Sequence, residues 1–262
     1  MSSQLKIAAI AGLALAVGIG IGPLLNGDPY GAEDPSPSPI PSPTATPMPL
    51  PYSYSPLKAG TYALGQFPDS PIGRMTATVP DGWHGIKGTT FANLFQDSDD
   101  AMAGGIFLSL PDNFYNDPCN TNAGLWDPPL GPTVDDFVAA MTKVPGYQTT
   151  APVDADLLGF HGTYLEETGP ASVATCTDGF SHAWQTKYNE TAEYLMDGQH
   201  NRLWVLDADG VRLLVSVTDS VAVPHSPGTD PVDMAQTQAV LDSIRIAPAP
   251  TPAGSPAGSP AP

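Results

Sequence analysis

Proline-rich segments near both ends of the chain constrain its fold more than any other feature. The sequence DPSPSPIPSPTATPMPLPYSYSP ends at residue 56, and PAPTPAGSPAGSPAP fills residues 248–262. Proline has a fixed φ and no backbone N–H, so such runs favour extended polyproline II spacers over helices or sheets. We therefore predict a disordered stalk over residues 28–56, a disordered tail over 248–262, and one globular domain over 57–247.

An uncharged, apolar run precedes the stalk, at residues 7–25. A helix of this length rises about 28 Å, close to the hydrocarbon thickness of a membrane. Lys6 lies before the run and Asp28 after it, so the positive-inside rule places the domain outside the cell membrane. We predict that residues 1–27 are a retained, single-pass signal anchor. The alternatives are a cleaved signal peptide, which would give a secreted protein, and a buried core helix.

The charge of the chain excludes some partners. The formal net charge is −18, with 27 Asp and Glu against 9 Lys and Arg. A field of this sign repels phosphate groups, so we expect neither nucleic acid nor an anionic lipid surface as a partner.

The chain has two cysteines, Cys119 and Cys176, both in the part predicted to lie outside the membrane. An even number of cysteines in an oxidising compartment predicts a disulfide. It would close a loop of about 57 residues, worth about 4 kcal/mol in the chain-entropy description. A pair of metal or redox thiols is the alternative, but the C-x-x-C spacing is absent.

Two segments of the domain have the pattern of helices. In TVDDFVAAMTK, Thr133 and Asp136 form a capping-box-like pair, and apolar residues recur at helical spacing. A second helix is predicted from Pro231, at the first helical position, to about Ser243. The rest of the domain is rich in β-type runs. The prediction is an α+β fold, mostly antiparallel β-sheet with the two helices packed on it.

The β-type runs are separated by turn signals. A strand over residues 163–168 would follow a turn at 159–162 and would place Tyr164 and Glu166 on one face. A long loop, rich in Asn, Asp and Pro, is expected over residues 111–132.

The stretch VLDADGVR, residues 205–212, resembles both a calcium loop and a tight turn. With Gly210 at position 6 of an EF-type loop, the ligand positions 1 and 12 fall on Val205 and Ser216, so both end ligands are missing. Asp209-Gly210 between β-type runs is instead a strong signal for a type I′ hairpin turn. We predict a hairpin there.

The acidic cluster Asp97, Asp99 and Asp100 gives a weak indication of a metal site. Carboxylates suit calcium, a hard cation that prefers oxygen ligands. No glycine or distal glutamate completes a known loop, so a solvated turn is the favoured interpretation. We expect no cofactor, with calcium as the alternative.

Trp126, in the loop NAGLWDPPLGP, is the tryptophan most expected to be exposed and is a weak candidate for binding sugar or peptide. Core packing is the alternative. The sequence lacks the G-x-S-x-G, S-x-x-K, P-loop, H-E-x-x-H and G-x-G-x-x-G motifs, so no catalytic residue is predicted.

The order of several motifs resembles a group of membrane-anchored or secreted proteins of high-GC Gram-positive bacteria. These motifs are TVPDGWHG, GGIFLSL, DPC, TVDDFVAAM, GFHGTYLEET, RLWVLDADGVRLLV and AVLDSIRI. The short motifs at the start and end also resemble the PsbP/Mog1-type fold. That resemblance implies a sheet with packed helices and a binding or accessory role more often than catalysis. The group supplies no catalytic residues to carry over.

These features together favour a non-enzymatic, extracytoplasmic domain that binds or assists another envelope component: a protein, a glycan or a small ligand. An envelope hydrolase with a Ser/His/Asp site assembled from distant positions is one alternative, since sequence order does not define a triad. The ectodomain of a sensor assembly is another.

Overall fold

The computed structural model describes residues 46–65, 67, 72–86, 90–94, 102–187, 192–220 and 231–247. The predicted anchor at 7–25, most of the stalk, and the tail at 248–262 lie outside these residues. Among the described helices, none has the length and apolar character needed to cross a membrane.

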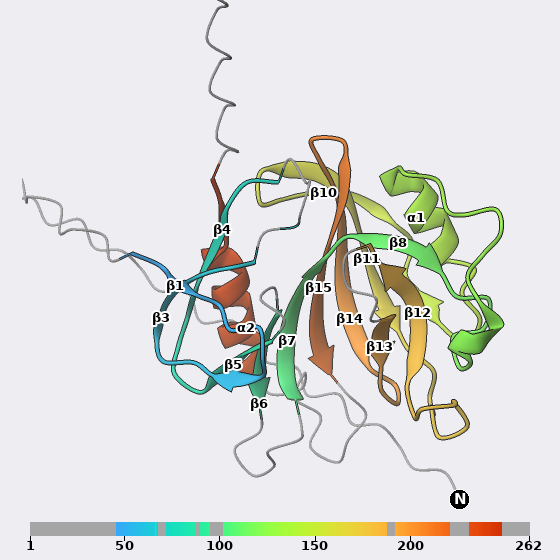
Figure 1. The fold of residues 1–262 in the computed structure, drawn as a ribbon, viewed down its shortest axis with the longest axis horizontal. Helices are drawn as coiled ribbons and strands as arrows, with labels where there is room; N and C mark the ends of the chain where they lie inside the picture. The colour runs from blue at the N-terminus through green and yellow to red at the C-terminus, as the bar shows by residue number, and fades with distance from the viewer. Residues whose placement is uncertain are drawn as a thin grey trace, which may run out of the picture. The chain divides into compact units, whose positions relative to one another are not determined.

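The fold is α+β, with mostly antiparallel sheets and two helices, as predicted. The two helices are α1 (Val134–Met141), which lies near β8, and α2 (Pro231–Ser243), which lies near β4 (Figure 1). The largest sheet runs in the order β10 (Val153–Leu157), β11 (Phe160–Thr168), β14 (His200–Ala208), β15 (Val211–Ser220), β7 (Met102–Ser109), β6 (Thr90–Leu94), β5 (Trp83–Ile86) and β2 (Ser55–Pro56), with β9 (Gln148–Thr149) also paired to β11.

Two smaller sheets complete the domain. The four-stranded sheet contains β1 (Met48–Pro49), β3 (Gly60–Ala63), β4 (Met75–Val79) and β16 (Arg245–Ile246). The three-stranded sheet contains β13 (Ala192–Leu195), β12 (Ser181–Thr186) and β8 (Pro111–Phe114). A short 3₁₀ helix, η1, spans Thr121–Ala123.

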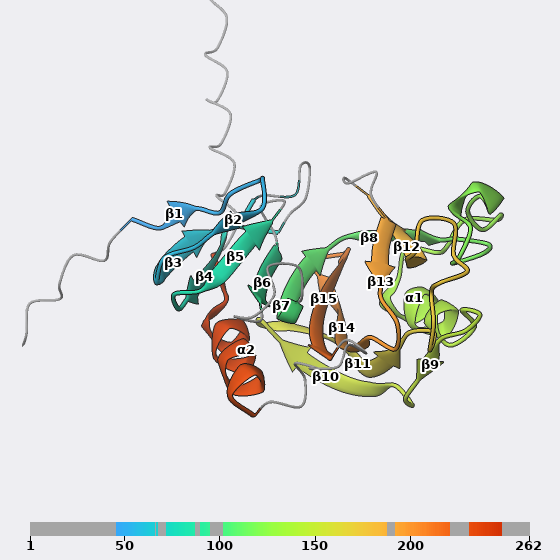
Figure 2. The ribbon, with the colours of Figure 1, turned by 90° about the horizontal axis from the view of Figure 1, so that it is seen from below.

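Two buried clusters lie on opposite faces of the strands β14 and β15. One cluster includes Leu206, Leu213 and Val215 from these strands, together with residues of the four-stranded sheet and α2. The other includes Leu203 and Leu214, together with residues of α1, β8 and β12. Figure 2 shows α1 and α2 on opposite sides of these strands. Each face of the sheet therefore has its own cover.

The helix α1 begins as the sequence predicts. Thr133 accepts a hydrogen bond from the amide of Asp136, and the Asp136 carboxylate accepts one from the Thr133 amide at 3.0 Å. The Thr133 hydroxyl also donates to the Asp136 carboxylate at 2.7 Å, and this bond is the largest cause that lowers the pKa of Asp136, followed by the bond from the Thr133 amide. The helix then buries Phe137, Val138 and Met141. Pro231 is likewise the first residue of α2, as predicted.

The hairpin predicted at VLDADGVR is confirmed. Ala208 and Val211 pair across a two-residue turn in which Asp209 and Gly210 have φ of 56° and 83°. Positive φ at both central residues defines the type I′ turn. The Asp207 carboxylate accepts a hydrogen bond from the Gly210 amide at 2.7 Å, which fixes the turn.

The turn predicted at residues 159–162 lies earlier, at Leu158 and Gly159. These residues have φ of 56° and 86°, and Phe160 already pairs with Leu157. A leucine at positive φ is uncommon because its side chain crowds the backbone, so the sequence pattern gives no signal for it. Tyr164 and Glu166 do share a face, as predicted, since the Tyr164 hydroxyl donates to Glu166 at 2.7 Å.

Two segments expected to lack regular structure contain strands. The predicted loop 111–132 includes β8 and η1, because Phe114 is fully buried and pairs with Trp184 of β12. The end of the predicted stalk, residues 46–56, contains β1 and β2, and Leu50 there is buried. Both β1 and β2 are edge strands, where proline is tolerated.

Cys119 and Cys176 form a disulfide, as predicted. It links the loop after β8 to the loop before β12. The backbone of Thr177 also donates to the Cys119 carbonyl at 2.9 Å, and the His182 amide donates to Pro118 at 2.7 Å. The disulfide therefore lies in a hydrogen-bonded junction beside the three-stranded sheet, and it is compatible with an extracellular domain.

Candidate functional site

The strands β11 and β14 present two different faces. Their register pairs Tyr164 with Trp204 and Leu165 with Leu203, so alternate residues point to opposite sides. We call one side the buried face; it consists of Leu165, Glu167, Asn201, Leu203 and Val205, all buried. We call the other the open face; it consists of Tyr164, Glu166, His200, Arg202 and Trp204, all only half-buried.

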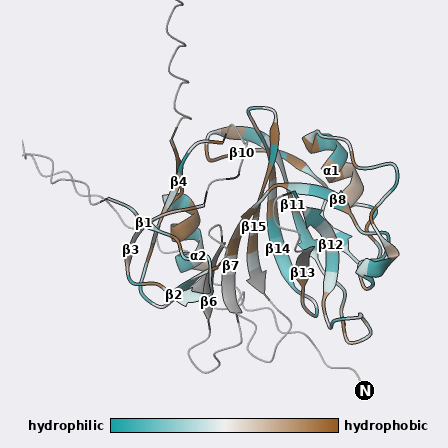
Figure 3. Cartoon of the chain, viewed as in Figure 1, coloured by the Kyte–Doolittle hydropathy of each residue, from teal (hydrophilic) through white to brown (hydrophobic). Residues whose placement is uncertain are grey.

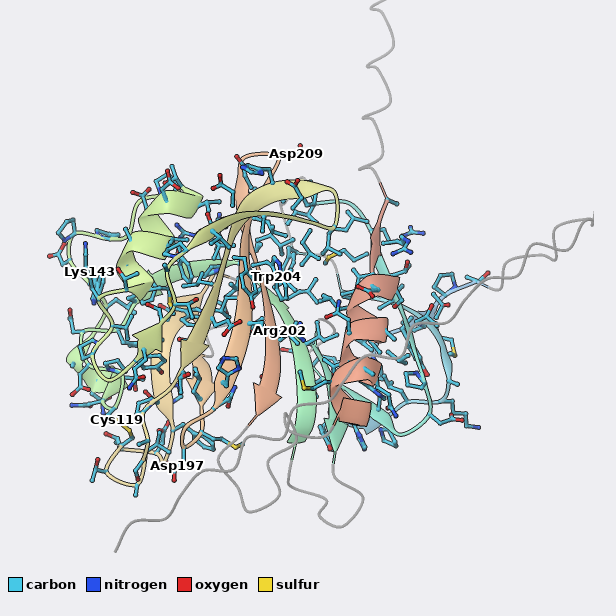
Figure 4. All side chains as sticks on the ribbon, turned by 180° about the vertical axis from the view of Figure 1, so that it is seen from behind. Cys119, Lys143, Asp197, Arg202, Trp204 and Asp209 are labelled. Atoms are coloured by element: carbon cyan, nitrogen blue, oxygen red, sulfur yellow. A yellow bond between two sulfur atoms is a disulfide. The ribbon has the colours of Figure 1, made fainter. Side chains whose placement is uncertain are left out.

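The open face is centred on two aromatic rings. The rings of Tyr164 and Trp204 lie 4.9 Å apart with a tilt of 50°. The Arg202 guanidinium lies 5.6 Å from the centre of the Trp204 ring. Figure 4 shows Trp204 and Arg202 side by side on β14, on the side of the sheet that carries α2. Partly exposed aromatic rings beside a cation are typical of binding surfaces, since they bury large contact areas at low entropic cost.

A carboxylate is held beside these rings. Glu166 accepts the Tyr164 hydroxyl, and its other oxygen lies 3.4 Å from His200 Nε2. The Tyr164 hydrogen bond is the largest cause that lowers the pKa of Glu166; burial opposes it, and His200 and Arg202 add to it. The side chains of Glu166 and His200 are still 40% and 30% exposed, so both can reach a partner. The carboxylate is thus fixed in position and ionised.

The helix α2 borders the open face and orients its cation. Arg202 donates to Gln238 Oε1 at 3.0 Å, and Gln238 donates in turn to Asp242 at 2.8 Å. This chain of hydrogen bonds limits the rotamers of Arg202, so less side-chain entropy is lost when a partner binds.

The open face continues onto the edge strand β10. Val153 pairs with Tyr164, which pairs with Trp204, so the three side chains form one row across three strands. Val153 is 53% exposed, which is unusual for a large apolar side chain among the described residues. In Figure 3, β15 is largely brown, whereas β14 carries a long teal segment. The polar and half-exposed part of the sheet is therefore its outer part, on the β10 side.

A second candidate is an open cleft of about 460 Å³ at the end of the sheet that carries both hairpin turns. It lies against the first turn of α1 and includes Asp154, His161, Asp207 and Arg212 in its lining. Arg212 is a fold anchor there, because it ties the beginning of β8 and the loop before α1 to β15. Its guanidinium donates to the carbonyl oxygens of Gly131, Thr133, Pro111 and Asp112 at 2.7, 2.9, 3.0 and 3.3 Å.

Trp126 is half-buried, whereas its position in a loop predicts that it is exposed. Its Nε1–H donates to the Tyr115 carbonyl at 3.1 Å, and its ring lies 5.1 Å from that of Phe114. The loop folds back on β8, which turns the indole toward the cluster under α1. The indole is therefore held by a hydrogen bond and only partly exposed, and the role of Trp126 as a binding residue stays a prediction.

The acidic cluster Asp97, Asp99 and Asp100 lies outside the described residues. Within the ranges that the structure describes, no group of three or more His, Cys, Asp or Glu side chains could hold a metal ion. The calcium alternative stays a prediction for those three residues.

Histidines and carboxylates do meet in the domain. His182 Nε2 lies 2.7 Å from Asp178, and His161 Nδ1 lies 2.9 Å from Asp156. Burial, the largest single cause, raises the pKa of Asp178, but the hydrogen bond from His182, the hydrogen bond from the Phe180 amide and the charge of His182 together outweigh it, so the pKa of Asp178 is lowered. The adjacent Ser181 hydroxyl is buried and accepts from Tyr147 at 2.8 Å. The contacts of His182 and Ser181 fix the start of β12, and that of His161 joins β11 to β10, so the open face remains the better candidate for function.

Arg202 and Trp204 are not among the site residues predicted from the sequence. Two other tryptophans, Trp83 and Trp184, are fully buried in the core. The signal was the alternation in RLWVLDA, where Arg202 and Trp204 share the face opposite to Leu203. An arginine beside a tryptophan on one strand face indicates that this part of the face reaches solvent, although Leu206 and Ala208 farther along the same face are fully buried.

Comparison of the chain with protein-family models found no match, and comparison with curated protein sequences found none either. The resemblance to the bacterial group and to the PsbP/Mog1-type fold therefore stays a prediction. The function has to be argued from the open face.

Proposed function

We propose that this chain is a non-enzymatic, extracytoplasmic binding or accessory domain of the bacterial cell envelope. Its open face contacts another envelope protein. The observation that carries the proposal is the arrangement of Trp204, Tyr164 and Arg202, where half-exposed aromatic rings and a cation are held in place by hydrogen bonds. Aromatic residues and arginine are the side chains that most often dominate the energy of protein interfaces.

The proposed location rests on two features. The disulfide between Cys119 and Cys176 is stable in an oxidising compartment and rare in the cytoplasm. The apolar run at 7–25 is long enough to hold the chain in the cell membrane, with the proline-rich segment as a spacer. Alkaline extraction of isolated membranes tests this location: the anchored chain stays in the membrane pellet, whereas a cleaved or peripheral chain is released.

The binding role is tested by crosslinking in intact cells. A photo-reactive phenylalanine analogue replaces Tyr164 in the full-length chain, and the control chain carries it in place of Lys143. Lys143 is exposed and lies away from Trp204 (Figure 4). We expect one discrete protein adduct from the Tyr164 position and none from the Lys143 position.

Other outcomes separate the alternatives. An adduct that glycosidase digestion removes would replace the protein partner by a glycan. Equal labelling from both positions, or no adduct from either, would contradict the open face as a binding surface.

A further inference from the structure

We propose that the partner binds as an extended strand with alternating basic and apolar residues, which adds to the free edge of β10. This inference rests on the proposed function, because the edge of β10 borders the open face. The edge of β10 determines which residues the partner segment must have, whereas the open face alone does not.

The backbone of β10 offers hydrogen-bonding groups along this edge. Leu157 and Phe160 close the two-residue turn, so they form a hydrogen-bonded pair, and such pairs recur at every second residue. Asp154 and Asp156 lie between these pairs, and their N–H and C=O groups therefore point away from β11. Among the strands that the structure describes, β10 lies at the end of its sheet. An extended peptide can pair with these groups, which is the usual mode of strand addition.

The side chains of the same two residues define the charge of the incoming strand. Asp154 pairs with Thr163 and Asp156 with His161, so both carboxylates lie on the side of the cleft rather than on the open face. Both residues are exposed, with the Asp156 side chain 81% exposed. A residue paired next to either one lies about 5 Å away across the strands. Lysine or arginine at that position is attracted, whereas an acidic residue is repelled.

The other side of β10 requires apolar residues in the incoming strand. Val153 extends the row of Tyr164 and Trp204 and ends at the free edge. An apolar side chain on the added strand would cover Val153 and lengthen this row by one member. Because successive side chains of a strand alternate between faces, the incoming strand must alternate basic and apolar residues.

A second copy of this chain does not meet that requirement. Pairing two β10 edges would bring Asp154 and Asp156 near the same aspartates of the other copy, and the chain carries a net charge of −18. Charged residues on an edge strand are also the common device against self-association. The acidic edge of β10 therefore repels the β10 edge of a second copy and attracts a basic strand.

The test measures hydrogen exchange of residues 153–157 in the full-length protein in detergent micelles, at low salt. The probes are the acetylated and amidated octapeptides KVKVKVKV, EVEVEVEV and KKKKVVVV. We expect KVKVKVKV to slow exchange of the segment at least about tenfold and the other two peptides to leave it unchanged. Protection by EVEVEVEV, or equal protection by KKKKVVVV, would overturn the proposal, since neither combines the charge with the alternation.

Three variants locate the contact. Asp154→Pro removes an outward N–H that β11 does not use, so protection by KVKVKVKV should be lost. Asp154→Asn with Asp156→Asn keeps the backbone and should weaken binding at least fivefold, while the matched control Asp209→Asn should not change it. Asparagine also adopts the positive φ of residue 209, so Asp209→Asn keeps the turn and removes one negative charge at a site away from the edge of β10. Unchanged binding by both edge variants would contradict strand addition.

The two proposals fail separately. A protein adduct at Tyr164 together with no peptide protection at β10 would leave the binding role standing and remove the strand-addition mode. Formation of a dimer that Asp154→Pro abolishes would replace the basic partner by a second copy and overturn the inference.

Discussion

The two faces of β14 differ although they belong to the same nine residues. Leu203 and Val205 are fully buried under α1 and the three-stranded sheet. Arg202 and Trp204, their immediate neighbours, are half-buried and lie beside α2. On the same face as Arg202 and Trp204, Leu206 and Ala208 are fully buried in the cluster that α2 covers. Only the part of this face around Arg202 and Trp204 is therefore within reach of a partner.

The largest expected effect on stability comes from removing the disulfide, which lies beside the three-stranded sheet that covers the buried face. The double variant Cys119→Ser and Cys176→Ser opens a loop of 57 residues. We expect a loss of about 4 kcal/mol in the free energy of unfolding, since the unfolded chain gains loop entropy. Urea unfolding of the variant and of the oxidised wild type measures it. A loss below about 1 kcal/mol would mean that the hydrogen bonds around Cys119 hold the junction without the disulfide.

The next effect compares the two faces directly. Leu203→Ala leaves a cavity in the buried face and should cost about 2–5 kcal/mol. Arg202→Ala, one residue away, removes a half-exposed cation and a ring contact and should cost about 1 kcal/mol or less. Urea unfolding of both variants gives the difference. Equal losses would show that the open face is part of the core after all.

A smaller effect concerns the helix that covers the buried face. Thr133→Ala removes the cap of α1 and should cost about 1 kcal/mol. The matched control Thr133→Ser keeps the hydroxyl and should stay close to the wild type. Thermal unfolding of the two variants tests this, and equal melting temperatures for alanine and serine would contradict the role of the capping box.

The smallest effect is a change in the pKa of Glu166 on the open face. The lowered pKa of Glu166 means that its contribution to stability is complete above the ordinary carboxyl pKa and is lost as pH falls through the lower, folded value. Tyr164→Phe removes the largest cause, so the pKa of Glu166 should rise toward its ordinary value. NMR titration of the Glu166 carboxyl carbon measures it, with Tyr62→Phe as control, because Tyr62 bonds the Lys58 carbonyl instead. An unchanged midpoint in Tyr164→Phe would contradict this network.

Local signals in the sequence predict several elements of the fold correctly. The capping pair of Thr133 and Asp136, Pro231 at the start of α2, and the turn at Asp209-Gly210 each depend on residues within one short segment. The turn at Leu158 could not be predicted, since the register of β10 and β11 forces a leucine to positive φ. The strand β8 was missed because its partner β12 lies about 70 residues away in the sequence.

The candidate site was harder to predict than the fold. The loop around Trp126 predicts that this tryptophan is exposed, yet its indole N–H donates a hydrogen bond to the Tyr115 carbonyl. To predict the open face, one must know that β11 pairs with β14, because this pairing brings Tyr164 next to Trp204, which lies 40 residues later in the sequence. Alternation within RLWVLDA places Arg202 and Trp204 on one face, but it does not show which strand lies beside them. Long-range pairing is the information that a single sequence does not contain.

The most direct test of this account is the yield of the Tyr164 photo-adduct in intact cells when the chain also carries Arg202→Ala. The account predicts that this variant stays folded and that the adduct yield falls about tenfold, because an arginine at the centre of an interface is worth more than about 1.4 kcal/mol of binding. An unchanged yield from a folded Arg202→Ala chain would contradict the claim that the open face is the binding surface.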